Sequence, residues 1–89
     1  MALFDLLGRR WTLRVLWELR GDALTFRELQ ARCGDMSSSV LNQRLRELRE
    51  AQVVAMHGGR GYELTTEGHA LLDALSPLNA WAARWEKRI

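Results

Sequence analysis

Cysteine and proline each occur only once in this sequence of 89 residues, as Cys33 and Pro77. A single cysteine excludes a disulfide within the chain, and with only His57 and His69 beside it no spaced set of metal ligands can form. The one proline and the lack of Ser- or Gly-rich tracts leave no linker. We therefore expect a single domain over residues 1–89 that needs neither a metal nor a cofactor.

Long hydrophobic runs are missing as well. Asp or Arg interrupts each apolar stretch well before the roughly 20 residues that a membrane helix needs. Asp5 precedes Arg9 and Arg10, which reverses the order of basic start and apolar middle found in a signal peptide. A lone cysteine fits a reducing compartment. We expect a cytoplasmic protein with no membrane partner.

The side chains that catalysis requires are scattered along the chain. One cysteine, two histidines and dispersed carboxylates form no nucleophile–base pair and no pair of acids, and no glycine loop suited to a phosphate is present. This pattern predicts that the protein is not an enzyme.

Apolar periodicity and capping residues predict mainly helices, with one small β-hairpin. Thr25 and Glu28 have the spacing of a capping box, and Ser37 and Thr65 are expected to cap later helices. Pro77 either kinks the last helix or begins a new one that runs to Ile89. The expected elements are helices over 2–7, 11–20, 26–32 and 38–50, strands over 53–57 and 62–64 around a tight turn at 58–61, and a last helix after Thr65.

This order is the layout of a winged helix-turn-helix domain, in which the helix before the hairpin enters the major groove of DNA. The charges agree with that layout. Residues 36–61 carry four basic and two acidic side chains, a surplus of +2 that equals the net charge of the whole chain. Residues 1–35 sum to +1 (six basic, five acidic) and residues 62–89 to −1 (three basic, four acidic).

The helix expected over 38–50 has two distinct faces. At 100° per residue, its apolar seam consists of Leu41, Leu45, Leu48 and Gln52. The opposite side is polar and holds Ser39, Asn42, Gln43, Arg46 and Glu50. Arg44 lies at the flank of the seam, where it serves either packing or a buried ion pair.

The polar side chains of this helix are suited to a DNA groove. Small Ser38 and Ser39 allow the start of the helix to approach a duplex closely and can donate to phosphates or base edges. The amides of Asn42 and Gln43 match adenine, and Arg46 matches guanine or a phosphate. The alternative is a solvated helix face, because polar outer faces occur on nearly every surface helix.

Arg60 stands at the tip of the glycine-rich turn. When a hairpin serves as a wing, a cation at this position reaches a phosphate or the minor groove. The alternative is a mobile turn that makes no DNA contact.

Four segments, which follow one another along nearly the whole chain, carry a resemblance to a known family. They are LGRRWTL at 7–13, TFREL at 25–29, SSSVLNQRLREL at 37–48 and LTTEG at 64–68. Together they strongly resemble the HxlR-type bacterial regulators. The resemblance implies a homodimeric transcription factor that binds double-stranded DNA through its recognition helix and wing and pairs its subunits through the terminal helices.

Carried over position by position, the resemblance points to the residues that contact DNA. Thr25 and Arg27 are expected at the DNA backbone and Arg60 at the wing. The groove residues are Ser38, Ser39, Asn42, Gln43 and Arg46. The residues expected in the dimer interface are Phe4, Leu7, Leu75, Leu78, Trp81 and Trp85.

The end of the chain supports such a dimer independently. Its apolar stripe, Leu71, Leu72, Leu75, Leu78, Trp81 and Trp85, is larger than a chain of this size can easily cover with its own core. Two-fold pairing sets the two recognition helices about 34 Å apart, one turn of DNA, and predicts a palindromic operator. The alternative is that Trp81 and Trp85 cap the core of a monomer. Trp11 and Trp17 are assigned to packing.

The role of Cys33 and the rival to DNA binding each depend on only a few residues. Cys33 occupies a position that the family usually fills with an apolar residue, which favours a buried structural thiol over a redox sensor. The rival function is a winged-helix module that binds another protein without reading DNA. It stays open because the arginines of residues 38–50 are partly offset by Glu47 and Glu50.

Overall fold

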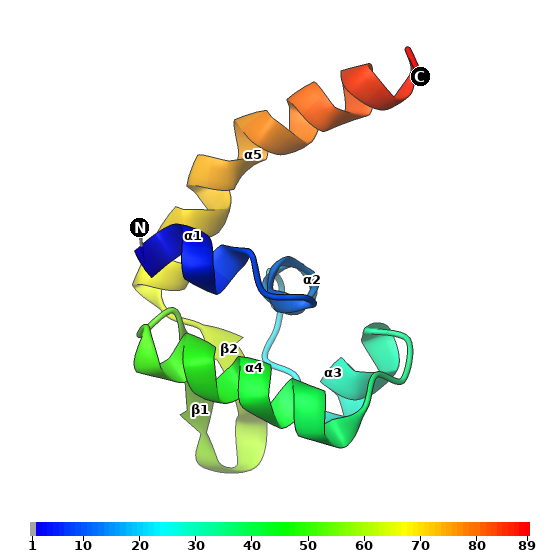
Figure 1. The fold of residues 1–89 in the computed structure, drawn as a ribbon. Helices are drawn as coiled ribbons and strands as arrows, with labels where there is room; N and C mark the ends of the chain where they lie inside the picture. Colours follow the sequence, from blue (N-terminus) through cyan, green and yellow to red (C-terminus); the bar gives the residue numbers. More distant parts are fainter. Residues whose placement is uncertain (1) are drawn as a thin grey trace.

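The structure is a computed structural model. It describes residues 2–89, and for Ala2 and Arg60 it describes the backbone alone. It has the predicted order of elements: helices, then a hairpin, then a long helix (Figure 1). The elements are α1 (Ala2–Leu7), α2 (Thr12–Glu18), α3 (Phe26–Arg32), α4 (Ser38–Glu50), β1 (Val54–His57), the 3-10 turn η1 (Gly58–Arg60), β2 (Gly61–Leu64) and α5 (Thr66–Glu86). The fold class predicted from the sequence is confirmed.

Side-chain caps begin three of the helices, as predicted. The Thr25 hydroxyl accepts a hydrogen bond from the Glu28 amide, and the Glu28 carboxylate accepts one from the Thr25 amide, which completes the capping box of α3. Ser37 accepts from the amide of Val40 at the start of α4. Thr65 caps α5 in the same way. Local sequence therefore determines where these helices begin.

Two predicted details of the helices are corrected and a third is decided. The second helix was expected over 11–20 but covers only Thr12–Glu18. It starts one residue later because the backbone of Trp11 is left-handed with φ 78°, and it ends where Leu19 leaves the helical conformation (φ −89°, ψ 5°). Gln52 does not extend the apolar seam of α4, because it lies beyond the helix end, exposed, with φ 64°. Pro77 lies inside α5, so it does not begin a new helix, and the alternative of one helix that contains the proline holds.

The core lies between α2, α3, α4 and the hairpin. The three leucines of the α4 seam, Leu41, Leu45 and Leu48, are almost completely buried, as predicted. They pack in one cluster with leucines of α2 and α3 and with Val54 and Leu64 of the hairpin. Burial of this seam holds one side of α4 against the body and leaves the other side outward.

Two glycines allow the hairpin and α5 to approach the body. Gly61 has φ 93°, and a Cβ there would lie 2.2 Å from the carbonyl oxygen of Leu24. This close approach allows Leu24 to form a β-bridge with Tyr62 at the side of the hairpin. Gly68 lies against Val53, where a Cβ would be 2.1 Å from the carbonyl oxygen. Both positions therefore require glycine for packing.

Only the beginning of α5 belongs to the body. Gly68 is buried and Leu71 and Leu72 pack against the core, whereas the helix beyond Leu72 leaves the body and ends far from it (Figure 1). The molecule is consequently elongated, with extents of 43 × 26 × 24 Å. None of the helices in residues 2–89 combines the length and apolarity needed to cross a bilayer.

Candidate nucleic-acid interface

The outward side of α4 carries the residues predicted for the DNA groove. Ser38, Ser39, Asn42, Gln43 and Arg46 are all exposed. The helix has 13 residues and is therefore about 20 Å long, a length that fits along a major groove about 12 Å wide. The structure thus brings these five residues together on one solvent-facing side.

The long polar side chains on this side are not used within the protein. In the described part of the chain, Asn42, Gln43 and Arg46 make no side-chain hydrogen bond and no ion pair. Their donors and acceptors are exposed to solvent and available to a ligand. In this they differ from Arg44 and Glu47 on the flank of the same helix, which pair with each other.

The serines at the start of α4 have a structural role as well. Gln30 of α3 donates to the Ser38 hydroxyl (3.1 Å) and to the carbonyl oxygen of Met36 (2.9 Å). Ser39 shares a hydrogen bond with Ser37, the cap of the helix (3.3 Å). These bonds hold the turn between α3 and α4, so the two serines position the helix in addition to facing outward.

Thr25 and Arg27, predicted for the DNA backbone, lie at the start of α3. Both are exposed, and Arg27 makes no ion pair with another described residue. The Thr25 hydroxyl is already an acceptor in the capping box. Hydrogen bonds with the Thr25 amide, and then with the Thr25 side chain, lower the pKa of Glu28. Desolvation acts in the opposite direction, and the charge of Arg32 adds a smaller lowering. Glu28 is consequently anionic at neutral pH.

An ion-pair cluster occupies the flank of α4. Glu47 accepts a hydrogen bond from Arg44 (3.0 Å) and pairs with Arg9 from the turn between α1 and α2 (3.3 Å). The Arg44 side chain is only 11% exposed, so the sequence alternatives of packing and ion pair are both realised. Because two arginines neutralise Glu47, it offsets Arg46 and Arg49 less than the sequence suggested.

The hairpin has the geometry of a short wing. Its strands are antiparallel, with register from Val54 opposite Leu64 to His57 opposite Gly61. The predicted turn at 58–61 is instead the 3-10 turn η1, and Gly61 already belongs to β2. The side chain of Arg60 lies outside the described residues, so its contact with DNA stays a prediction.

The residues predicted for the dimer interface are largely exposed. The exposed fractions are 68% for Phe4, 58% for Leu78, 51% for Trp81 and 47% for Trp85. Leu7 and Leu75 are half-buried. The rings of Trp81 and Trp85 stack on each other with centroids 5.8 Å apart. These tryptophans do not cap the core of the monomer, since they lie on the part of α5 that leaves the body.

A groove between α2 and α5 adds two residues that the sequence reasoning missed. It has a volume of about 580 Å³, and Leu13 and Trp17 of α2 line it opposite Leu75 and Leu78. Trp17 is 46% exposed, so its assignment to packing is wrong, whereas Trp11 does pack against the core. The sequence showed that Leu13 and Trp17 are four residues apart and share a helix face, but not whether the fold covers that face.

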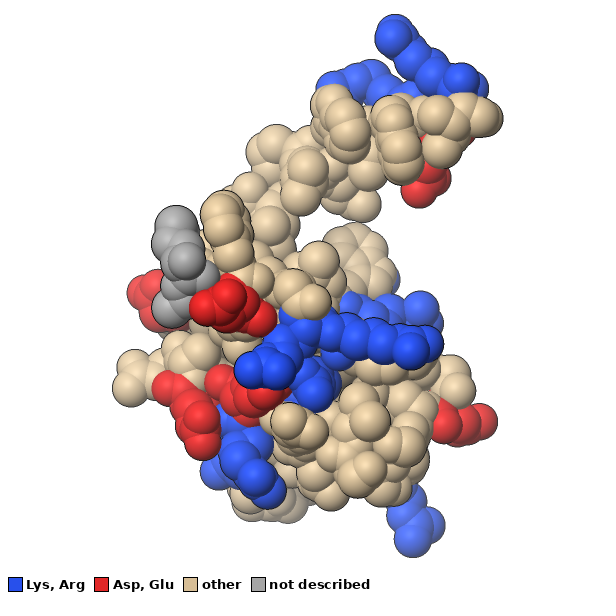
Figure 2. Space-filling model, viewed as in Figure 1, with Lys and Arg blue, Asp and Glu red and all other residues tan. Residues whose placement is uncertain are grey.

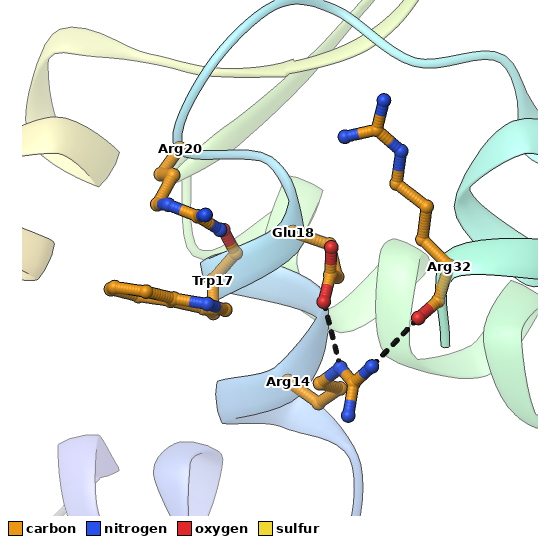
Figure 3. Close-up of polar contacts among 5 residues, drawn as sticks. All are labelled: Arg14, Trp17, Glu18, Arg20 and Arg32. Carbon is orange, nitrogen blue, oxygen red and sulfur yellow. Dashed lines mark hydrogen bonds and ion pairs between the residues drawn. The ribbon is translucent and has the colours of Figure 1, made fainter. Parts of the chain in front are cut away.

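Two arginines, Arg14 and Arg20, are among the residues that line this groove. Arg20 places its guanidinium 4.0 Å from the centre of the Trp17 ring and donates to the Trp17 carbonyl oxygen (Figure 3). Arg14 pairs with Glu18 (2.9 Å) and donates to the carbonyl oxygen of Arg32 (2.8 Å), which ties α2 to α3. Charges of both signs are intermixed on the face drawn in Figure 2.

Cys33 is a buried thiol, as predicted. Burial raises its pKa, the positive charge of Arg14 acts in the opposite direction, and Glu18 adds to the rise. A thiol with a raised pKa forms little of the reactive thiolate at neutral pH. The residues described by the structure also contain no group of three or more metal-ligating side chains.

Comparisons with known proteins agree with this geometry. The family model described as HxlR-like helix-turn-helix matches residues 6–89. The HTH-type transcriptional regulator YvaP of Bacillus subtilis is 31% identical over 87 residues, which cover 91% of this chain and 81% of YvaP. The HTH-type transcriptional regulator MJ0925 of Methanocaldococcus jannaschii is 26% identical and covers 98% of this chain and 85% of its own length.

A solved structure is similar over nearly its full length. The quinone-bound YodB from B. subtilis superposes with a TM-score of 0.86 at 30% identity, and the match covers 93% of this chain and 92% of the YodB chain. The relatives named here as HTH-type are transcriptional regulators, not enzymes.

Proposed function

This chain belongs to the HxlR-like helix-turn-helix family of transcriptional regulators, and on that premise we propose that it binds specific DNA sequences as a homodimer, with α4 in the major groove. One observation carries the proposal. The outward side of α4 presents Asn42, Gln43 and Arg46 with no intramolecular partner among the described residues, above a fully buried leucine seam.

The chemistry of these three side chains defines what α4 reads. The amides of Asn42 and Gln43 can each donate to and accept from adenine, whereas Arg46 can donate two hydrogen bonds to guanine or to a phosphate. A good two-bond contact with a base discriminates against the wrong base by about 1–3 kcal/mol. Ser38 and Ser39 at the start of α4 are short enough to let the helix end approach the duplex.

Contacts with the DNA backbone set the orientation of α4. Thr25 and Arg27 lie at the start of α3, the helix that crosses the backbone in this fold, and their exposed side chains are proposed to bind phosphates. Arg60 at the wing is proposed to add a further phosphate or minor-groove contact. These contacts supply affinity, whereas α4 supplies sequence preference.

The dimer is proposed to form through the terminal helices. The exposed residues Phe4, Leu78, Trp81 and Trp85, with half-buried Leu7 and Leu75, form an apolar surface that water otherwise covers. The groove between α2 and α5 continues this surface through Leu13 and Trp17. Two-fold symmetry then predicts a palindromic operator with half-sites one DNA turn apart.

Selection from a pool of random duplexes tests DNA reading directly. We expect enrichment of a palindrome, tighter binding to it than to a shuffled duplex, and a steep loss of both affinities with salt. Asn42→Ala together with Arg46→Ala should reduce the preference for the selected duplex. Arg88→Ala removes the same charge far from α4 and serves as the control. Failure to enrich any sequence, with specific capture of a protein partner, would instead favour the protein-binding module.

A further inference from the structure

Glu47 connects the recognition helix to a distant part of the chain. Its two carboxylate oxygens pair with different arginines: Oε1 with Arg44 of α4 (3.0 Å) and Oε2 with Arg9 (3.3 Å). The other ion pairs between described side chains lie within one helix or across the hairpin. Arg9–Glu47 is therefore the one ion pair in the described part of the chain that joins elements far apart in sequence.

The turn that carries Arg9 is held in a defined conformation. The Gly8 amide donates to the Phe4 carbonyl oxygen (2.8 Å), and a Cβ on Gly8 would lie only 2.8 Å from that oxygen. The Arg9 amide donates to Leu6, and Trp11 adopts the left-handed conformation that begins α2. The turn thus directs Arg9 to one place, the flank of α4.

Packing between α1 and α4 is incomplete around this ion pair. A hollow of about 520 Å³ lies between them. Its lining includes Leu3 and Leu6 of α1, Arg9, Glu47 and Glu50 of α4, Val53 just before β1, and Leu71 of α5. Leu6 and Leu7 pack against the core, but the hollow leaves the side of α1 that faces Glu47 without tight apolar packing. The ion pair of Arg9 with Glu47 is the polar contact that joins the α1–α2 turn to α4 beside this hollow.

Glu47 also holds the buried arginine of α4. The Arg44 side chain is 11% exposed, its Nε has no hydrogen-bond partner, and Glu47 is its partner on the other side of the guanidinium. Gln43 and Glu47 are four residues apart, so Glu47 lies next to the groove side of α4. Glu47 therefore contacts Arg44 directly and lies one helical turn from Gln43, one of the residues proposed to read bases.

We propose that Glu47 is a positioning residue for DNA reading: by holding Arg9 and Arg44 together it sets α4 against the α1–α2 turn. Arg9 then influences base discrimination without touching a base. This inference rests on the DNA binding proposed above. The same ion pair connects the end of α1, whose Phe4 and Leu7 are proposed dimer residues, to the recognition helix α4.

Two neighbouring arginines provide a matched test. Arg9 and Arg10 are both exposed and carry the same charge, but the described contact of Arg10 is with the Trp11 ring, 5.6 Å away. The quantity measured is the ratio of the dissociation constants for a shuffled and a selected duplex at one salt concentration. We expect Arg9→Ala to lower this ratio about threefold to fivefold, which corresponds to the upper part of the range for an exposed ion pair. Arg10→Ala should leave the ratio unchanged.

Two further variants separate positioning from general destabilisation. Arg9→Lys keeps the charge and should restore most of the ratio. In a Glu47→Gln background, Arg9→Ala should have no additional effect, because the partner is already gone. Thermal unfolding of Arg9→Ala should stay close to that of the wild type, since Arg9 is exposed.

The outcomes distinguish this inference from the proposed function. If the wild type prefers the selected duplex but Arg9→Ala and Arg10→Ala change the ratio equally, the role of Glu47 is wrong and DNA reading stands. If Arg9→Ala lowers the ratio as much in the Glu47→Gln background as in the wild type, the role of Glu47 is likewise wrong and DNA reading stands. A wild type without any preference overturns both proposals.

Discussion

Truncation of Trp81 to alanine should dissociate the proposed dimer. Trp81 stacks on Trp85 along the part of α5 that leaves the body, and about half of its surface contacts solvent in the single chain. In a dimer formed through α5, this half becomes covered by the partner. The loss on truncation can be calculated from the area concerned.

A tryptophan side chain presents up to about 250 Å², so the exposed half of Trp81 corresponds to about 120 Å². At about 25 cal/mol per Å², covering it contributes about 3 kcal/mol. A two-fold interface contains one Trp81 from each subunit, so this contribution is made twice. Ordering costs consume part of this gain on association. We therefore expect Trp81→Ala to weaken dimerisation about a hundredfold to a thousandfold, which equals about 3–4 kcal/mol.

Sedimentation equilibrium over a range of concentrations measures this change. Met56→Ala is the control, because Met56 is a large apolar residue of similar exposure that lies on the hairpin instead of on α5. Trp81→Ala should shift the monomer–dimer midpoint and Met56→Ala should not. A wild type that is monomeric at micromolar concentration, or equal behaviour of the two variants, would refute the interface.

Three further predictions concern the fold that supports the site. Gly61→Ala should lower the melting temperature strongly, because the new Cβ would lie 2.2 Å from the carbonyl oxygen of Leu24 at a φ of 93°; a melting temperature equal to that of the wild type would contradict the tight approach. Cys33 should react with a thiol reagent at pH 8 only after denaturant is added, since burial raises its pKa and blocks access; rapid reaction of the folded protein would contradict this. The pKa of Glu28 is lower in the folded than in the unfolded chain, so its contribution to stability is present above about pH 4.5 and is lost as the pH falls through the folded pKa. Urea unfolding at several pH values should therefore show a weaker acid dependence for Glu28→Gln than for the wild type, and identical profiles would contradict the capping role.

The helix starts were predictable because the information is local. Thr25, Ser37 and Thr65 each cap a helix through a hydrogen bond to a residue three positions later. The spacing of Leu41, Leu45 and Leu48 likewise indicated the buried side of α4. The outward side of α4, which carries the candidate site, follows from that burial as its complement.

Features that depend on contacts between distant segments were not predictable. The left-handed backbone of Trp11 is adopted by few non-glycine residues, and no local signal marks it. The ion pair of Arg9 with Glu47 joins residues that the sequence places in separate elements. Trp17 was assigned to packing because apolar spacing alone does not indicate which side of a short helix the fold covers.

Pro77 illustrates a further limit. Proline removes a backbone donor and crowds the preceding turn, so the sequence predicted either a kink in the last helix or a new helix that begins at Pro77, without deciding between them. In the structure α5 continues through Pro77 on the part of the helix that faces solvent. Water can satisfy the carbonyl group that proline leaves without a partner, and a long helix is thereby retained.

The central claim is that α4 reads bases with Asn42, Gln43 and Arg46. The most direct measurement is the ratio of affinities for a selected palindromic duplex and a shuffled duplex, determined for the wild type and for the Asn42→Ala, Arg46→Ala double variant at the same salt concentration. We predict a clear preference in the wild type that falls at least tenfold in the double variant, with affinity for shuffled DNA reduced far less. An unchanged ratio in the double variant would contradict base reading by α4.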